Sequence, residues 1–351
     1  MGHEEGYKPK TLDLVLRDLA GGCNLIDAEW KRQGEPAAER QMLYVENFRS
    51  TRGGDVTLAP GFALTALSEN ETPVWIQDQP LALIAWERAS GAVTPVAVMP
   101  TRALSMLTGA GSGEPNVAVE CIFSSAAPTV SWDTMYNRLY IATGTNYVAE
   151  LSDDGAVGLE FEDGFNFPSV LCRHMGRMFY AGFRGNSDHL ARSYIRYSDS
   201  GNPRTMTDPG TDDVLLVRSQ NDDWITSMVS MGDSLLVFKR RSVWVVSGDD
   251  FFGTGGLSIQ QLISEYGASG PGCTLRTPSG VYFANESGVF LLESPGAPLR
   301  EVSTTISPMF SRRVKALDVS FPSVAHESLE QAQFCYDPVE HEVFLAVGVH
   351  G

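Results

Sequence analysis

The sequence predicts an all-β protein, built as a β-propeller-like ring of small antiparallel sheets. Three observations carry this prediction: two hairpins follow one another within Trp224–Leu292, similar strands recur at blade-like intervals, and turn-forming residues are abundant. The 351 residues include 34 Gly and 19 Pro, without the Gly-x-y period of collagen. With 43% hydrophobic and 20% charged residues, the chain has a globular composition and can bury a large core.

The two hairpins have the composition of paired strands. The first spans Ser234–Val246 and turns at Lys239–Arg241, and the second spans Gly280–Leu292 and turns at Asn285–Gly288. Their apolar runs are rich in β-branched and aromatic residues and show no helical stripe. The segment between them, Tyr266–Gly272, is too rich in Gly and Pro for regular structure, so we expect it to connect one blade to the next.

The chain before residue 74 differs from the rest, and we expect it to form an adaptor or docking segment over residues 1–73. Thr11–Leu19 fits an edge strand or one helical turn. Asp27–Tyr44 has the clearest helix signal of the chain, although Gly34 and Pro36 interrupt it. From Val74 the pattern becomes β and remains so, which predicts a propeller-like domain over residues 74–351.

Five apolar strands of similar sequence recur through the second part of the chain. Each follows a turn-like pair or triplet of residues, and we interpret each as the strand that opens a hairpin. They begin at residues 139, 178, 235, 281 and 343, spacings of the size expected for propeller blades with insertions. A β-sandwich would give shorter and more even spacing, so the series favours the propeller.

The last strand of the series, Val343–Val349, has no return strand before the sequence ends at Gly351. We therefore expect an incomplete last blade. Either a strand from the N-terminal part completes it, as often happens in propellers, or a longer natural chain has been cut here.

Charge and composition narrow the classes of function. The formal net charge of −17 argues against a basic groove that binds nucleic acid tightly. No apolar leader or long apolar span is present, so we expect no signal peptide and no membrane partner. The five cysteines are odd in number and include no Cys-x-x-Cys pair, so we expect reduced thiols and no zinc site.

The motifs that could carry catalysis are weak, and we predict no catalytic, metal-binding or cofactor-binding residues. The glycine-rich stretches Gly109–Gly113 and Gly253–Gly256 lack the pattern of a phosphate-binding loop. Adjacent aspartates such as Asp222-Asp223 are explained by turn chemistry. Tyr197–Asn202 is similar to the aspartate box of sialidase propellers, but it occurs once and its spacing is imperfect.

Short motifs, taken in order, resemble the tail nozzle proteins of short-tailed bacteriophages, also called tail tubular B-like or packaged-DNA-stabilisation proteins. The resemblance extends from about Asp13 to Phe344 and depends on the order of the motifs. The family-motif positions are Gly21, Gly22, Asn47, Phe48, Pro60, Gly61, Trp224, Gly267, Gly270, Pro271 and Gly272.

The resemblance implies a virion structural protein without catalytic activity, assembled in the host cytoplasm and located in the phage tail. Such proteins form a ring, usually a hexamer, that retains the packaged genome and conducts it through the DNA-exit channel. They dock adaptor or portal-side proteins and tail fibres or spikes. The acidic composition then predicts a channel that double-stranded DNA contacts only transiently and non-specifically. Arg240 and Arg241 are candidates for contact with a neighbouring subunit or a phosphate.

Two alternatives belong to other classes of function. A solitary β-propeller could bind a protein or a glycan, and a propeller glycosidase would need two carboxylates facing each other across a pocket. Oligomeric state separates the first alternative from the nozzle, because a nozzle forms a symmetric ring.

Overall fold

The computed structural model describes residues 48–50, 56–58, 81–108, 115–161, 166–184, 189–205, 214–217, 223–248, 257–310, 323–339, 341–347 and 349–350. The chain divides into two compact units. The smaller contains Met1–Thr65 with Thr305–Pro308, and the larger contains Ala66–Thr304 with Met309–Gly351. In the smaller unit, β1 (Phe48–Ser50) pairs antiparallel with β2 (Val56–Leu58). The segments predicted at Thr11–Leu19 and Asp27–Tyr44, and the boundary predicted after residue 73, lie outside the described residues.

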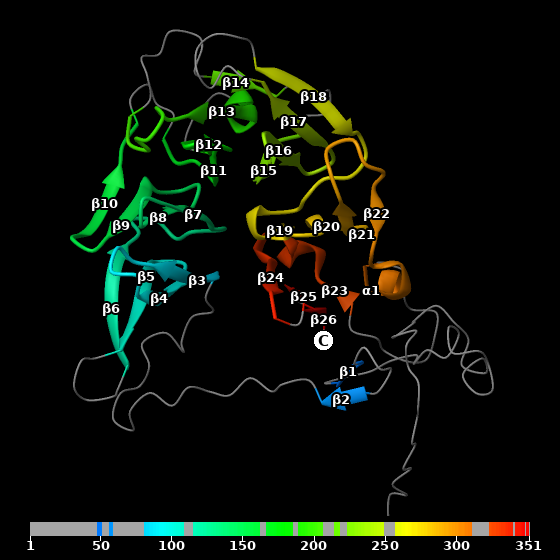
Figure 1. Ribbon diagram of the computed structural model, residues 1–351, viewed down its shortest axis with the longest axis horizontal. Helices are drawn as coiled ribbons and strands as arrows, with labels where there is room; N and C mark the ends of the chain where they lie inside the picture. The colour runs from blue at the N-terminus through cyan, green and yellow to red at the C-terminus, as the bar shows by residue number, and fades with distance from the viewer. Residues whose placement is uncertain are drawn as a thin grey trace, which may run out of the picture. The chain divides into compact units, whose positions relative to one another are not determined.

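The larger unit is a five-bladed β-propeller (Figure 1). In the described ranges each blade is a four-stranded antiparallel sheet whose strands pair in chain order. The blades are β3 (Ala82–Glu87), β4 (Val93–Val98), β5 (Arg102–Thr108) and β6 (Pro115–Ile122); β7 (Ser131–Met135), β8 (Arg138–Ala142), β9 (Val148–Ser152) and β10 (Gly155–Leu159); β11 (Val170–His174), β12 (Arg177–Ala181), β13 (Tyr194–Tyr197) and β14 (Val214–Leu216); β15 (Ile225–Met231), β16 (Ser234–Lys239), β17 (Val243–Ser247) and β18 (Ser258–Ile263); and β19 (Thr274–Thr277), β20 (Gly280–Asn285), β21 (Gly288–Leu292) and β22 (Arg300–Glu301).

Short elements complete the described part of the chain. Two small sheets near the end of the sequence pair β24 (Gln333–Asp337) with β25 (Glu342–Ala346) and β23 (Ser323–Val324) with β26 (Val349–His350). The helical segments are η4 (His189–Ser193), η6 (Pro271–Cys273), η7 (Thr304–Ile306), α1 (Ser307–Phe310) and η8 (His326–Gln331). None of the described helices has the length and apolar character needed to cross a membrane.

The recurring strands of the sequence are confirmed as strands, and four of them open the predicted hairpins β8–β9, β12–β13, β16–β17 and β20–β21. The sequence missed the additional strand that comes before each of them in the blade. The recurring strands lie in β8, β12, β16, β20 and β25, and each pairs with a strand that precedes it. The preceding strands have a less uniform apolar pattern; β7, for example, is Ser-Trp-Asp-Thr-Met with its middle residues partly exposed. The turn-like leads are the turns between these two strands, and at Tyr136 and Asn137 φ is 52° and 61°, as a tight hairpin turn requires.

The last recurring strand also has a partner that precedes it. Residues 343–346 lie in β25, which closes a hairpin with β24 instead of opening one. Val349 belongs to the separate strand β26, which pairs with Val324 of β23. Among the described residues β25 pairs with β24 alone, in a two-stranded sheet, so the expectation of an incomplete last blade stays a prediction.

The core lies between neighbouring blades. Buried apolar side chains form clusters between the first and second, second and third, and third and fourth blades. Between the fourth and fifth blades, the rings of Phe238 and Phe283 lie 5.3 Å apart. Each blade therefore buries both of its faces only when its neighbours are present, which couples the stability of the blades.

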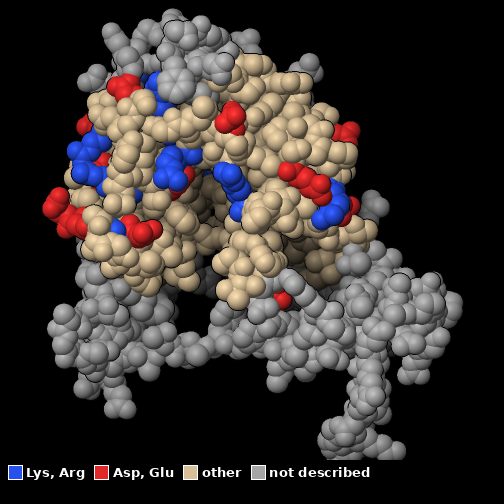
Figure 2. All heavy atoms as spheres, in the orientation of Figure 1, with Lys and Arg blue, Asp and Glu red and all other residues tan. Residues whose placement is uncertain are grey.

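The first strands of the later blades surround a central cavity of about 510 Å³. Its lining comes from β7, β11, β15, β19 and β24, together with the turn at Met175. Figure 2 shows the hollow in the middle of the face drawn, with basic side chains beside it. Arg173 and Arg276 are the basic residues that line the cavity. Apolar, polar and charged side chains thus line the described cavity.

Side-chain hydrogen bonds connect the innermost strands of adjacent blades. The Ser131 hydroxyl donates to the Leu171 carbonyl at 3.2 Å and accepts from the Leu171 amide at 3.0 Å. Two residues further, Asp133 accepts a hydrogen bond of 2.6 Å from the Arg173 amide. Burial raises the pKa of Asp133, and the backbone amides of Arg173 and Thr134 oppose that rise. The free edge of β11 is therefore satisfied by the side chains of β7.

The described cysteines are free thiols that differ in exposure, and this difference predicts their reactivity. Cys172 and Cys273 are buried, Cys121 is intermediate and Cys335 is exposed. Burial raises the pKa of Cys121 to about 11 and that of Cys273 to about 12, so both are protonated near neutral pH.

In a Cys23→Ser variant, we expect the exposed thiol of Cys335 to react with a disulfide reagent about a hundredfold faster than the other three thiols. Buried thiols react only after local opening of the fold. Timed labelling with absorbance detection measures the rates. Adding Cys335→Ser should remove the fast phase. A fast phase that remains would contradict the burial of the other thiols.

Candidate functional site

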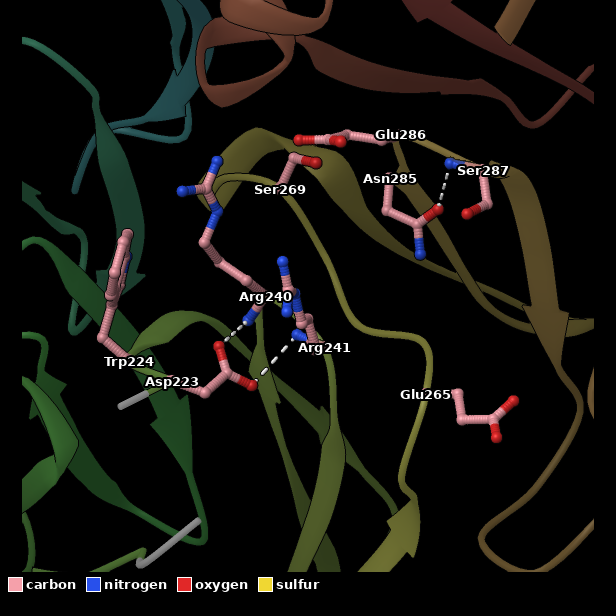
Figure 3. Close-up of a pocket in the computed structure, with 9 residues that line it drawn as sticks. All are labelled: Asp223, Trp224, Arg240, Arg241, Glu265, Ser269, Asn285, Glu286 and Ser287. Atoms are coloured by element: carbon pink, nitrogen blue, oxygen red, sulfur yellow. Dashed lines mark hydrogen bonds between the residues drawn. The ribbon is translucent and has the colours of Figure 1, made fainter. Parts of the chain in front are cut away.

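A polar pocket of about 420 Å³ lies between the fourth and fifth blades (Figure 3). Its walls come from the β16–β17 turn, the β20–β21 turn, and the segments that lead into β15 and β19. Because successive strands are antiparallel, these turns lie at the opposite end of the blades from the turn at Met175, which borders the central cavity. The lining residues are Asp223, Trp224, Arg240, Arg241, Glu265, Ser269, Asn285, Glu286 and Ser287.

The carboxylate of Asp223 fixes the backbone of the basic turn, which is formed by Arg240 and Arg241 between β16 and β17. Its Oδ1 accepts the amide of Arg240 at 2.9 Å, and its Oδ2 accepts the amide of Arg241 at 3.0 Å and the hydroxyl of Ser242 at 3.2 Å. Figure 3 shows the two amide bonds as dashed lines. Asp223 is buried, so these bonds form out of water, where a carboxylate gains most from charge-assisted donors. The positions of the two arginine backbones are therefore fixed before any ligand binds.

Lys239 belongs to strand β16, although the sequence analysis placed it in the hairpin turn with Arg240 and Arg241. Lys239 is the last residue of β16, pairs with Ile225 and is fully buried. Its Nζ donates to the carbonyl of Asp223 at 2.8 Å and to the hydroxyl of Ser193 at 3.2 Å. Burial lowers its pKa from 10.5 to about 8, against the opposing charge of Asp223. The sequence could not show this burial, because its hydrogen-bond partners come from distant segments.

This lowered pKa predicts how stability depends on pH. Below about pH 8 the folded state holds a buried ammonium, which costs stability. Between the folded pKa of about 8 and the unfolded pKa of 10.5, the unfolded chain binds the proton more strongly, so stability rises with pH. We expect a rise of about 2 kcal/mol between about pH 7.5 and about pH 9.5 from this group, measured by urea unfolding. Lys239→Met should lack this rise, and an equal rise in both proteins would contradict the burial.

Trp224 and Arg240 form the side of the pocket nearest the fourth blade. The guanidinium carbon of Arg240 lies 5.0 Å from the centre of the Trp224 ring, and that of Arg192 lies 5.8 Å from it. Arg240 also makes a long ion pair of 3.7 Å with Glu330, and both side chains are 36% exposed. Since exposed ion pairs contribute little, this pair leaves Arg240 able to exchange its partner for a ligand.

The opposite wall is polar and partly rigid. The Asn285 amide nitrogen donates to the Gly267 carbonyl at 2.9 Å, and its oxygen accepts the amide of Ser287 at 2.7 Å. These bonds orient the β20–β21 turn. Glu265 and Glu286 are exposed, and they place acidic side chains at the pocket edge (Figure 3). The pocket therefore combines guanidinium and hydroxyl donors with acidic borders.

The glycine-rich segment before β19 passes between other backbones at very short range. A Cβ on Gly267 would meet the Lys239 carbonyl, one on Gly270 the Glu330 carbonyl, and one on Gly272 the Ala332 carbonyl. Pro271 begins the 3₁₀ helix η6, so this part is not wholly irregular. These glycines are needed for close approach: Gly267 lies against the β16–β17 turn, and Gly270 and Gly272 lie against the chain at Glu330 and Ala332.

The predicted positions fall into three groups. Gly21, Gly22, Asn47, Pro60 and Gly61 lie outside the described residues, and Phe48 begins β1 of the smaller unit. Trp224, Arg240 and Arg241 line the pocket, and Gly267, Gly270, Pro271 and Gly272 lie in the segment beside it.

Sequence reasoning missed Asp223, Ser269 and Asn285 as pocket residues. The available signals were the Asp222-Asp223 pair and the polar turn after Ala284, both of which turn chemistry also explains. Among the described residues, no group of three or more His, Cys, Asp or Glu side chains is placed to hold a metal ion.

Among known proteins, the chain matches solved structures of low sequence identity. No protein family matches the chain, and no curated protein matches it. Among solved structures, the chain is similar to PorZ, described as an essential bacterial surface component of the type-IX secretion system of Porphyromonas gingivalis, with 12% identity and a TM-score of 0.42 over 63% of this chain and 28% of that one. It is similar to the extracellular domain of the putative hybrid two-component system BT4673 from B. thetaiotaomicron, with 10% identity and a TM-score of 0.43 over 78% and 37%.

The N-terminal domain of Nup159 matches with 10% identity and a TM-score of 0.38, over 57% of this chain and 58% of that one. The chain thus spans less than two thirds of each of these proteins. These neighbours are β-propeller proteins, and at such low identity they carry no argument about function.

Proposed function

We propose that the protein is a non-catalytic binding module, a β-propeller that docks a protein partner at the pocket between the fourth and fifth blades. The observation that carries this proposal is the basic turn held by Asp223, since the carboxylate accepts both the Arg240 and the Arg241 amides. A recognition site gains affinity when its contact residues are positioned before binding.

The composition of the pocket supports a protein partner. Trp and Arg are the residues most often responsible for affinity at protein interfaces, and here Trp224 and Arg240 lie beside one another. The Arg240 guanidinium lies 5.0 Å from the centre of the Trp224 ring, which leaves less of that ring for stacking on a sugar. This geometry favours a peptide over a glycan as the ligand.

Selection of a random peptide library on the immobilised full chain tests the proposal. We expect a peptide family whose binding is lost in the Arg240→Ala/Arg241→Ala variant and kept in Arg300→Ala. Arg300 is a matched control because its side chain is 61% exposed and its ion pair with Glu293 is long, at 3.8 Å. Peptides that bind all three proteins equally, or the enrichment of no peptide, would refute docking at this pocket.

A subunit of a phage tail nozzle is the second candidate, and the order of the sequence motifs favours it. Such a role is a specific form of partner docking, in which the partners are copies of the same chain and neighbouring tail proteins. Light scattering on the purified chain tests it: we expect the mass of a ring, usually a hexamer in proteins that the motifs resemble. A monomer at every concentration would count against the nozzle and leave the binding module standing.

A further inference from the structure

We infer that the pocket binds an acidic protein segment, with the guanidinium groups of Arg240 and Arg241 receiving two of its Asp or Glu carboxylates. The inference rests on the proposed function, because it names the chemistry of the partner at the same pocket. Three features support it: the guanidinium donors of Arg241, the position of Arg240 beside Trp224, and the distribution of charge around the β16–β17 turn.

The pocket offers donors that the fold itself does not use. Asp223 is engaged by the backbone amides of Arg240 and Arg241, so its carboxylate holds the turn and not the guanidinium groups. Among the described residues, the guanidinium of Arg241 makes no hydrogen bond or ion pair, and its residue is exposed. Such a group gains a partner at little desolvation cost when a carboxylate enters the pocket.

Arg240 is positioned for bidentate binding. Its guanidinium lies over Trp224 at 5.0 Å, and Figure 3 shows the side chain extending past the ring toward Ser269. A guanidinium that stacks on an aromatic face keeps its N–H donors in the plane of the group, where they match the two oxygens of a carboxylate. The Trp224 ring therefore orients the Arg240 guanidinium without occupying the N–H donors of that group.

The charge around the turn is locally positive on an acidic protein. Arg240 and Arg241 follow the buried Lys239; the Asp223 carboxylate bonds the backbone of this turn, and Glu330 makes only a long ion pair of 3.7 Å with Arg240. The chain as a whole carries a net charge of −17, so the turn is an exception to its surroundings. Opposite charge at a small patch favours an anionic ligand and speeds its association.

The acidic residues at the pocket edge favour an acidic peptide over a nucleic acid as the anionic ligand. Glu265 and Glu286 lie at the pocket edge, where they repel a ligand that carries charge along its whole length. A nucleic acid carries a phosphate at every residue, whereas a peptide can place carboxylates between neutral residues. A peptide with spaced carboxylates therefore fits both the arginines and the border.

Fluorescence anisotropy with defined peptides tests this inference on the full chain. The probes are labelled peptides of alternating Glu and Ser, alternating Gln and Ser, and a labelled oligothymidylate. We expect the Glu peptide to bind at least about tenfold more tightly than the Gln peptide, as a charged hydrogen bond provides. Oligothymidylate should bind more weakly than the Glu peptide.

Variants locate the effect in the pocket. Arg240→Ala/Arg241→Ala should weaken binding of the Glu peptide about tenfold or more, and Arg240→Lys/Arg241→Lys should give an intermediate loss because lysine keeps charge but not the fork. Arg300→Ala should leave binding unchanged. Thermal unfolding of each variant confirms that it is folded.

Three outcomes overturn the inference: equal binding of the Glu and Gln peptides, oligothymidylate binding as tightly as the Glu peptide, or full binding in the double alanine variant. If library selection yields pocket-dependent peptides without acidic residues, the inference fails and the proposed function stands. If no selected peptide depends on the pocket, both fail.

Discussion

Gly270→Ala should destabilise the folded protein by about 3 kcal/mol or more, or prevent its folding, because the added methyl group would overlap the backbone of Glu330. The neighbouring backbone cannot move easily, since Gly272 approaches Ala332 in the same way and Cys273 Sγ donates to the Leu329 carbonyl at 2.9 Å. Equilibrium unfolding in urea measures the loss.

Gly158→Ala is the matched control for this substitution. Gly158 lies in β10, where the nearest atom to an added methyl group is Tyr147 Cβ at 3.6 Å, an ordinary contact. We expect its unfolding midpoint to change little, with an effect within about 1 kcal/mol. If Gly270→Ala and the wild type unfolded at the same urea concentration, the glycine-rich segment before β19 would not lie against η8 as the structure shows.

Glu150→Gln should destabilise the folded protein by about 1 to 3 kcal/mol, because it removes the buried carboxylate that two partly exposed arginines share. Glu150 is 1% exposed and bonds Arg138, and it receives Arg204 Nε at 2.8 Å and Arg204 Nη2 at 2.6 Å. Arg204 follows β13 of the third blade, whereas Glu150 lies in β9 of the second. The substitution therefore loosens the contact between two blades.

The pH dependence of Glu150 gives a second readout. Burial raises the pKa of its carboxyl, but the hydrogen bonds of Arg204 and Arg138 outweigh burial and lower the pKa below 4.5. A lowered folded pKa contributes stability that is present above the unfolded pKa and lost as the pH falls through the folded pKa. As the pH falls, we expect the free energy of unfolding of the wild type to lose the contribution of this ionised carboxylate. The Glu150→Gln variant should not show this loss.

Glu293→Gln is the control for the carboxylate. Its ion pair with Arg300 is 3.8 Å long, with side chains 58% and 61% exposed. Exposed pairs of this kind contribute well under about 1 kcal/mol, so the unfolding midpoint should barely change. A loss as large as that of Glu150→Gln would mean that burial does not set the strength of these pairs here.

The strands were largely predictable because their signal is local. The apolar runs at Ser234–Val246 and Gly280–Leu292 became the hairpins β16–β17 and β20–β21 with shifts of about one residue at their ends. The first strand of the second to fifth blades was not predicted, because it borders the central cavity and mixes polar with apolar residues. In β7, Asp133 and Ser131 bond the next blade, a use that no local pattern reveals.

The site was predictable only in pieces. Arg240, Arg241 and Trp224 were noticed separately, but their meeting depends on Asp223, Ser269 and Asn285 from other segments. The burial of Lys239 depends on Ser193, which is 46 residues away. Consecutive basic residues therefore have opposite environments, which a sequence pattern of charge cannot separate.

The most direct test of docking at the pocket is the indole N–H resonance of Trp224, followed by NMR during titration with the alternating Glu and Ser peptide. The chain contains 6 Trp, and Trp224→Phe assigns the signal. Trp132, which lines the central cavity on another part of the propeller, serves as an internal control. We predict a saturable shift of Trp224 with the Glu peptide, none with the Gln peptide, and an unchanged Trp132. Recognition at this pocket would be contradicted if the Trp132 resonance shifted while the Trp224 resonance did not, or if the Trp224 resonance did not shift at saturating peptide.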